Sequence, residues 1–242
     1  VATGNDGQVL TSAGAGQPPA FETPAGGVTF KEGGTNFSNS LLVGTSGTGT
    51  LSSADGNTGV GKAVLAALTS GDQNVAVGCY ALNANTSGSG NVGIGLETLA
   101  KVTTVSDLTA VGRCALEANT SGTENTSIGA YAMRENTTGD KNTAVGYASL
   151  QVNLSADQNT GVGYFALNSN TTGINNVAVG ANALDSNTEG SKNIAVGQNS
   201  LGTVTTGNNN VAVGHIALED LTTASDNTAI GAFSSRNITT GA

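Results

Sequence analysis

The chain has 242 residues, of which 36 are Gly, and it contains no Trp, one His and one Met. A globular domain of this length normally fills its core with large side chains. The apolar residues here are mostly Ala and Val, so any core must be thin. Only 10% of the residues are charged and the formal net charge is −9, which excludes electrostatic attraction to nucleic acid or to an anionic membrane. The longest apolar run, residues 63–68, is too short to insert into a bilayer.

Two regions are expected along the chain. Residues 1–39 contain Pro18, Pro19 and Pro24 with scattered Gly, which predicts an extended N-terminal connector. Residues 40–242 contain an internal repeat and are expected to form the second region.

A possible nucleotide motif opens the repeat region. The stretch GNTGVGKA, residues 56–63, matches the phosphate loop G-x-x-x-x-G-K-[ST] except at Ala63, which replaces the hydroxyl that would hold magnesium. A phosphate loop would also need a following helix and an acidic metal partner. The repeat explains every matched residue, so we interpret the motif as a coincidence.

The repeat has a period of 17 residues. A Gly that follows Val or Ile recurs at this interval from Gly44 to Gly231, and we number the unit so that this Gly is position five. One unit, residues 176–192, reads NVAVGANALDSNTEGSK. Position one is Asn in ten of eleven units, with Leu108 as the exception, and position thirteen is Thr except at Leu154. About twelve such repeats are expected.

The composition of the unit predicts an all-β fold. Invariant Gly, frequent Asn and β-branched residues oppose a helix and favour strands and turns. Seventeen residues suit one coil of a parallel β-solenoid, or β-roll, with two short strands and two turns, and successive coils bonded at about 4.8 Å. The second strand is expected at positions seven to nine, as in residues 147–150. Eleven steps would make a rod about 50 Å long.

Alternation along the first strand assigns its faces. Positions two and four, mostly Val, Ile or Thr, are expected to point into the coil and meet the Leu of position nine. Positions three and five hold only Ala, Gly or Ser apart from Leu42, which predicts close approach of another backbone. We expect that backbone to belong to copies of the chain around a fibre axis. The alternative is that these small residues pack inside a very flat coil.

The Asn of position one predicts a hydrogen-bonded ladder, in which each side-chain amide bonds to the next along the coils. Leu108 interrupts this ladder. If the Asn side chains point inward, Leu108 should form an apolar plug with Val102 and Val105.

The two cysteines are expected to be free. Cys79 and Cys114 occupy positions six and seven of coils two steps apart, so roughly 9.6 Å separates them, beyond the about 7 Å Cα limit for a disulfide. His215, the single imidazole, falls at a variable outward position and is expected at the surface. We therefore predict no catalytic residue, no metal and no cofactor, and that the protein is not an enzyme.

Two further features admit other functions. Acidic residues near one corner suggest calcium between coils, although their irregular recurrence favours a solvated corner. The Thr ladder of position thirteen suggests an ice-binding surface, although it lies beside Gly at a predicted turn. The acidic residues concerned are Asp72, Asp140, Asp157 and Asp226.

The repeat, NVAVGxxAL..NTTG.N, resembles the repeats of bacteriophage tail-fibre and related virion-appendage proteins. It is also similar to the SVAIG head repeats of trimeric autotransporter adhesins. Upstream, GNDGQVLTSAGAGQPPAF, residues 4–21, resembles a segment common in phage tail fibres and favours that family. The resemblance implies a homotrimer of parallel solenoids in a virion tail or extracellular appendage, with other fibre or baseplate proteins as partners.

The aromatic residues of the repeat all occupy positions six or seven. Tyr147, Tyr164 and Phe165 fall together and are the candidate receptor-binding residues, because exposed aromatic rings dock sugars such as a host cell-surface glycan. The alternative is that they fill grooves between the subunits of the trimer. The sequence thus predicts a structural segment of a phage tail fibre or tail-like appendage that acts as a spacer and presents a receptor-binding surface. A trimeric bacterial surface adhesin and an ice-binding solenoid are the alternatives.

Overall fold

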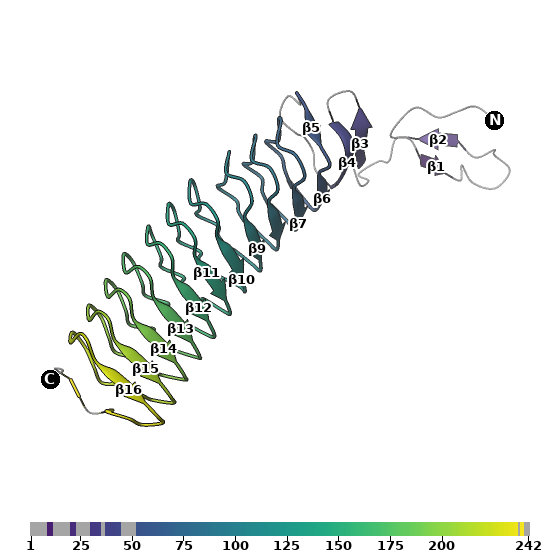
Figure 1. The fold of residues 1–242 in the computed structure, drawn as a ribbon. Helices are drawn as coiled ribbons and strands as arrows, with labels where there is room; N and C mark the ends of the chain where they lie inside the picture. Colours follow the sequence, from purple (N-terminus) through teal and green to yellow (C-terminus); the bar gives the residue numbers. More distant parts are fainter. Residues whose placement is uncertain are drawn as a thin grey trace.

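The computed structural model describes residues 9–11, 20–22, 30–34, 37–44, 52–236 and 238–239. Over these residues the protein is all-β, with no helix, and forms an elongated parallel β-solenoid (Figure 1). Most of the predicted connector lies outside the described residues. Within it, β1 (Val9–Thr11) pairs antiparallel with β2 (Ala20–Glu22).

One sheet runs the length of the solenoid and is parallel from its second strand onward. It starts where β3 (Phe30–Gly34) pairs antiparallel with β4 (Phe37–Val43), and β4 also pairs with the short β5 (Ala54–Asp55). After β5 each coil supplies one strand, paired in register with the strand 17 residues before it. About eleven coils result, which confirms the predicted fold class. The strands are β6 (Thr58–Val60), β7 (Val75–Val77), β8 (Val92–Ile94), β9 (Thr109–Val111), β10 (Thr126–Ile128), β11 (Thr143–Val145), β12 (Thr160–Val162), β13 (Val177–Val179), β14 (Ile194–Val196), β15 (Val211–Val213) and β16 (Thr228–Ile230).

The second strand predicted at positions seven to nine is wrong. Residues at positions seven and nine are left-handed, as at Ala148 (φ 53°) and Leu150 (φ 51°), so this side of the coil is a series of turns. Their amides still bond between coils: Ala148 donates to the Ala130 carbonyl and Leu150 to the Ala166 carbonyl, both at 2.9 Å. Leu suits position nine better than Val or Ile because β-branched residues are strongly disfavoured at positive φ.

The predicted faces of the strand are reversed. The position-three residues Ala144 and Ala178 are fully buried, whereas position-four Val179 is 37% exposed. Leu at position nine does point inward, and it leaves little space opposite. A Cβ added to Gly93 at position three would already contact the Leu82 and Leu99 side chains at 3.4–3.6 Å. The small residues of position three therefore pack inside a flat coil, while Val, Ile and Thr at positions two and four face outward.

The Gly of position five meets the next coil of the same chain, rather than a second chain as predicted. Gly146 has φ +136°, and a Cβ there would lie 2.3 Å from the carbonyl oxygen of Gly163. Real Cβ atoms do not approach so closely, and a side chain would also be strained at this φ. Glycine thus permits the coil spacing along the whole rod.

The Asn residues of position one are buried and form a ladder, as predicted, although its bonds run mainly from side chain to backbone. Asn176 Oδ1 accepts the N–H of Asn193 at 2.9 Å, and its Nδ2 donates to the Gly190 carbonyl at 2.8 Å. Direct amide-to-amide bonds also occur, as from Asn74 Nδ2 to Asn57 Oδ1 at 3.0 Å.

Leu108 replaces one Asn of this ladder and is fully buried. Val102 and Val105 are buried in the same continuous core, and the predicted plug of these three side chains stays a prediction. The backbone N–H of Leu108 still donates to Asn91 Oδ1 at 3.0 Å. The substitution therefore interrupts the side-chain ladder, which resumes at Asn125, without leaving its own amide unpaired.

A second buried Asn ladder, at position twelve, was not predicted. Each Nδ2 donates to Oδ1 of the preceding Asn, as from Asn153 to Asn136 at 3.0 Å, and to the carbonyl three residues later, here Ala156 at 2.9 Å. The ladder ends at Val204, and Oδ1 of Asn187 is consequently buried without a hydrogen bond. The sequence does contain a signal for it, because Asn recurs at position twelve immediately before the Thr of position thirteen.

Replacing Asn176 by Ala should destabilise the solenoid by about 1–3 kcal/mol, because the buried Asn193 amide loses its acceptor. Leu108→Asn is the matched control. It restores the repeat consensus at the same position and should change stability far less. Thermal unfolding followed by circular dichroism measures both, and equal, negligible shifts would contradict a stabilising ladder.

Candidate functional site

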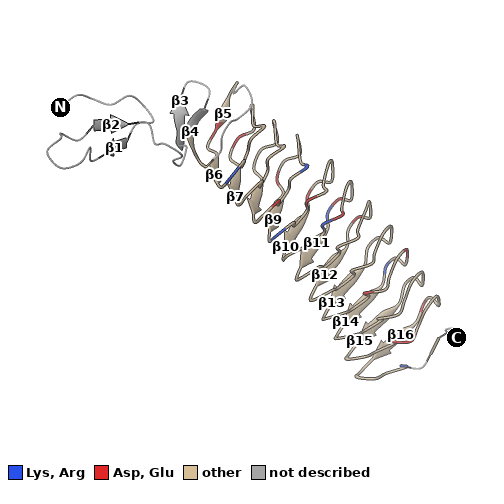
Figure 2. Ribbon diagram, turned by 180° about the vertical axis from the view of Figure 1, so that it is seen from behind, with Lys and Arg blue, Asp and Glu red and all other residues tan. Residues whose placement is uncertain are grey.

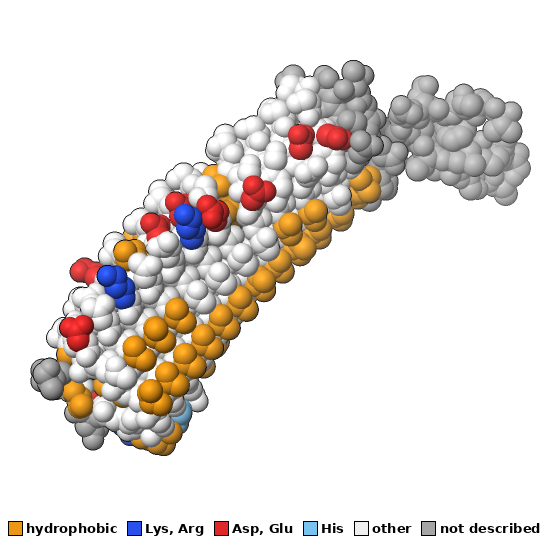
Figure 3. All heavy atoms as spheres, viewed as in Figure 1, with side chains coloured by type: hydrophobic (Ala, Val, Ile, Leu, Met, Phe, Trp, Pro, Cys, Tyr) orange, Lys and Arg blue, Asp and Glu red, His pale blue; other side chains and the backbone are white. Residues whose placement is uncertain are grey.

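The outward face of the sheet carries two rows of uncharged side chains. We define the sheet face as positions two and four of β6 to β16, which hold Thr, Val and Ile only. Figure 3 shows its apolar side chains in rows along the rod, and Figure 2 shows the charged residues on the turns. Several members are well exposed, among them Val60 (43%), Ile94 (39%) and Ile128 (40%). A long apolar face of this kind is typical of an interaction surface.

The three predicted receptor-binding residues lie together. Tyr147 and Tyr164 stack with centroids 5.6 Å apart and an interplanar angle of 17°, and Phe165 meets Tyr164 edge-on at 4.5 Å. Tyr131 joins them, 5.7 Å from Tyr147, and we call these four residues the aromatic cluster. Tyr147 and Tyr164 are 45% and 55% exposed, so they offer ring surface to a ligand or to another subunit.

Two hollows on the turn side were not predicted. Both are lined mainly by side chains of positions seven and ten from successive coils, and in each, one coil has a small residue at position ten. These residues are Ala100 and Gly202. The first hollow, about 300 Å³, is lined by Tyr80, Asn83, Glu97, Ala100 and Glu117. The second, about 230 Å³, is lined by Asn182, Asp185, Ser186, Asn199, Gly202, Thr203 and Glu219.

The sequence does carry a signal for these hollows. The usual NTTG turn is replaced in two coils by AKVTT, residues 100–104, and GTVTT, residues 202–206. In both coils Val replaces the ladder Asn at position twelve, and a small residue, Ala or Gly, occupies position ten. A departure shared by two coils thus coincides with both hollows.

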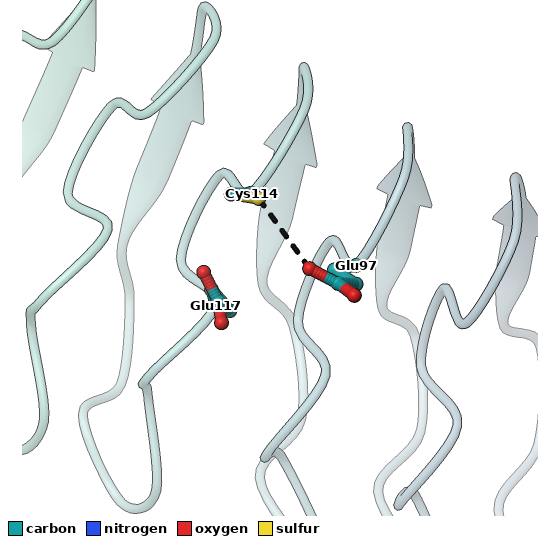
Figure 4. Close-up of side chains that lie close together, drawn as sticks. All are labelled: Glu97, Cys114 and Glu117. Atoms are coloured by element: carbon teal, nitrogen blue, oxygen red, sulfur yellow. Dashed lines mark hydrogen bonds between the residues drawn. The ribbon is translucent and has the colours of Figure 1, made fainter.

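A cluster of two carboxylates and one thiol adjoins the first hollow (Figure 4). Ligand atoms of Glu97, Cys114 and Glu117 lie within 4.8 Å of one another, and the Cys114 thiol donates to Glu97 at 3.7 Å. Burial, and then the negative charges of Glu117 and Glu97, raise the pKa of Cys114. Arg134 pairs with Glu117 at 3.2 Å. With a protonated thiol and a compensated carboxylate, the cluster is internally satisfied.

The acidic corner is built into the coils. At position sixteen, side-chain oxygens accept backbone amides of the preceding coil: Asp72 from Asp55 at 2.8 Å, and Asp140 from Thr123 at 2.7 Å. Asp157 accepts the Asp140 amide in the same way, at 2.8 Å. These carboxylates thus have a structural role, which explains why Ser and Asn replace Asp at this position elsewhere.

The remaining predicted features fit the repeat. The Thr hydroxyls of position thirteen donate to the next coil, as from Thr137 to the Leu154 carbonyl at 2.8 Å, so they are already engaged in the fold. His215 is exposed, as predicted. Residues 56–63 form β6 and the adjoining turns, and no helix follows within the described residues, in agreement with our rejection of the phosphate loop.

Comparisons with family models, curated proteins and solved structures find no match to this chain. Among the described residues, no helix has the length and apolarity needed to cross a membrane. The fold and its faces therefore define an elongated β-solenoid repeat protein with an apolar sheet face, an exposed aromatic cluster and two polar hollows.

The two cysteines, free as predicted, should differ in reactivity. Cys114 is 5% exposed and its pKa is raised, so it remains a protonated thiol at neutral pH, whereas Cys79 is partly exposed. Because the thiolate is the reactive form, iodoacetamide at pH 7.5 should label Cys79 first. Mass spectrometry of the proteolysed protein measures the order. Faster labelling of Cys114 would contradict the geometry, and equal labelling in denaturant is the control.

Proposed function

We propose that the chain is a structural, non-enzymatic segment of a phage tail fibre or tail-like appendage, located in the virion tail or an extracellular appendage. The observation that carries the proposal is the uniform rod: strands β6 to β16 pair without a change of register. Such a rod spaces and stiffens, and the aromatic cluster offers a receptor-binding surface on it. The resemblance of the repeat and of residues 4–21 to phage fibre proteins supplies the context.

We further propose that the fibre is a homotrimer with the sheet face toward its axis. No strand from β6 to β16 places a charged residue on this face. Its rows repeat at about 4.8 Å, so a second copy of the chain matches them coil for coil. A strip on the order of 50 Å by 10 Å per copy gives about 1,000 Å² in total for a pair, the lower end of specific interfaces.

The alternatives differ in support. A trimeric bacterial adhesin would have the same rod and is distinguished by the particle or cell that carries the chain. The ice-binding alternative rested on the Thr hydroxyls of position thirteen, and those hydroxyls are engaged between coils, as from Thr69 to the Thr86 carbonyl at 2.8 Å. Imaging a phage particle with antibodies against this segment tests the preferred location directly.

The double variant Val145→Lys, Val162→Lys should dissociate the trimer. It places two ammonium groups per subunit on the sheet face, where no partner charge compensates them. Sedimentation should show three times the 23.6 kDa of one chain for the wild type and one chain for the variant.

The control is Thr138→Lys, Thr172→Lys, which adds the same charge at exposed turn residues and should remain trimeric. Circular dichroism should be unchanged in both variants, because neither alters an inward-facing residue. A wild-type segment that sediments as a well-behaved monomer would refute the trimer.

A further inference from the structure

We propose that the second hollow binds one ring of an uncharged oligosaccharide, a further ring of which stacks on the aromatic cluster. This names the ligand class for the receptor-binding surface of the proposed function, and it rests on that function only for the origin of the sugar. The spacer and trimer proposals do not depend on it.

The shape of the hollow comes from one missing side chain. Position ten holds Asp185 and Glu219 in the neighbouring coils, and Gly202 between them leaves the gap. A Cβ on Gly202 would find only ordinary contacts, 3.4 Å to the Asn199 carbonyl and 3.7 Å to Asp185. The backbone therefore accepts a side chain here, and close packing does not explain the absence of one. A volume of about 230 Å³ suits one sugar ring rather than a larger group.

The lining has the hydrogen-bonding groups that sugar hydroxyls need. A hydroxyl both donates and accepts, and the hollow offers amides from Asn182 and Asn199 and carboxylates from Asp185 and Glu219. Ser186 adds a hydroxyl. Few large apolar side chains line the site, so an apolar ligand gains little there. An anionic sugar would lie beside the Glu219 carboxylate, which disfavours it, so the expected ligand is an uncharged sugar.

A metal ion is the less favourable occupant. Arg236 compensates the charge of Glu219, since its Nε lies 3.1 Å from Oε2, although the two are not aligned as a hydrogen bond. Burial is the main cause that raises the pKa of Asp185, so its carboxyl resists carrying the charge that a cation requires. Asn182 Nδ2 donates to Asn199 Oδ1 at 3.3 Å, which occupies one more oxygen that could serve as a ligand.

The aromatic cluster continues directly into the hollow. Asn182 occupies the same position of the repeat as Phe165, one coil later, and its N–H donates to the Tyr164 carbonyl at 2.8 Å. Gly202, where the gap lies, is two coil steps beyond the coil of Phe165, about 9.6 Å along the rod, so the rings and the hollow both lie within the length of a short oligosaccharide. Sugar rings present an apolar C–H face that packs on aromatic rings, while their hydroxyls seek polar partners. The two sites together match a linear oligosaccharide laid along the coils.

The test uses the full chain and three uncharged hexasaccharides, of glucose, of galactose and of N-acetylglucosamine, observed by saturation-transfer NMR at millimolar concentration. At least one should bind the wild type. Gly202→Gln fills the hollow with a residue that position ten holds elsewhere, at Gln151, and should weaken binding at least about tenfold. Phe165→Ala should weaken it similarly by removing part of the stacking surface.

Ala66→Gln is the matched control, because it makes the same kind of change at position ten far from the second hollow, and it should bind as the wild type. Asn199→Ala is the second test variant, since it removes a lining amide without adding volume. Circular dichroism and sedimentation should be unchanged for every variant. Loss of sugar binding in Gly202→Gln or Asn199→Ala, with fold and mass unchanged, then reports on the hollow, and the same loss in Phe165→Ala reports on the aromatic cluster.

Three results would overturn the proposal: no hexasaccharide binds the wild type, Gly202→Gln and Asn199→Ala both bind as the wild type does, or binding requires added Ca²⁺, which would indicate a cation site. Each of these leaves the trimer and spacer proposals standing. Conversely, a wild-type chain that is monomeric and binds sugar would contradict the trimer proposal and support the hollow as a sugar site.

Discussion

The backbone hydrogen bonds between successive coils determine which residues fit at each position of this protein. They hold each strand about 4.8 Å from the next, and a 17-residue coil must return to the same place to form them. At that spacing no Cβ fits at position five: an atom added to Gly78 would lie 2.3 Å from the Gly95 carbonyl oxygen. The same spacing brings identical residues of neighbouring coils into contact, so any residue that bonds well to its own copy becomes a ladder.

The ladders compensate for a thin core. A typical coil buries one large side chain at position nine, usually Leu, which contributes about 1.5–3 kcal/mol. The flat interior leaves space opposite for Ala or Gly only, so hydrophobic burial cannot grow with coil size. Two buried Asn residues in a typical coil add further bonds. Asn170, for example, donates through Nδ2 to Asn153 and Gly173 and accepts at Oδ1 from Asn187. Loss of one hydrogen-bond partner lowers the stability of the fold strongly, because the other partner is left buried and unpaired.

The period, the fold class and the inward Leu were predictable because each follows from residue types with a clear physical role. Gly allows the close coil spacing, β-branched and turn residues favour a β fold, and Leu fills the core. The face of the strand was not. The strand's β-branched residues are predicted inside because that is their usual place, whereas here the turns supply the large core residue and only the small residue of position three points inward. That arrangement follows from left-handed φ at positions seven and nine, as at Tyr131 (61°) and Met133 (45°), in residues that rarely adopt it. Periodicity alone does not reveal such a backbone.

The candidate site was predictable from the sequence only where a side chain differs in type from its copies in the other coils. The aromatic cluster was visible as large rings in a column of small and polar residues. The hollows were missed because they arise from an absence: at position ten Gly202 simply lacks the side chain that its neighbours carry. In a repeat protein each residue lies beside its copies in the neighbouring coils. A side chain that is shorter in one coil than in its neighbours therefore leaves a space whose shape those neighbours define. Interruptions of the consensus at buried positions, such as Leu108, are absorbed by the core. Interruptions at surface positions have no core to absorb them, and they are where a rod of identical coils can acquire a binding site.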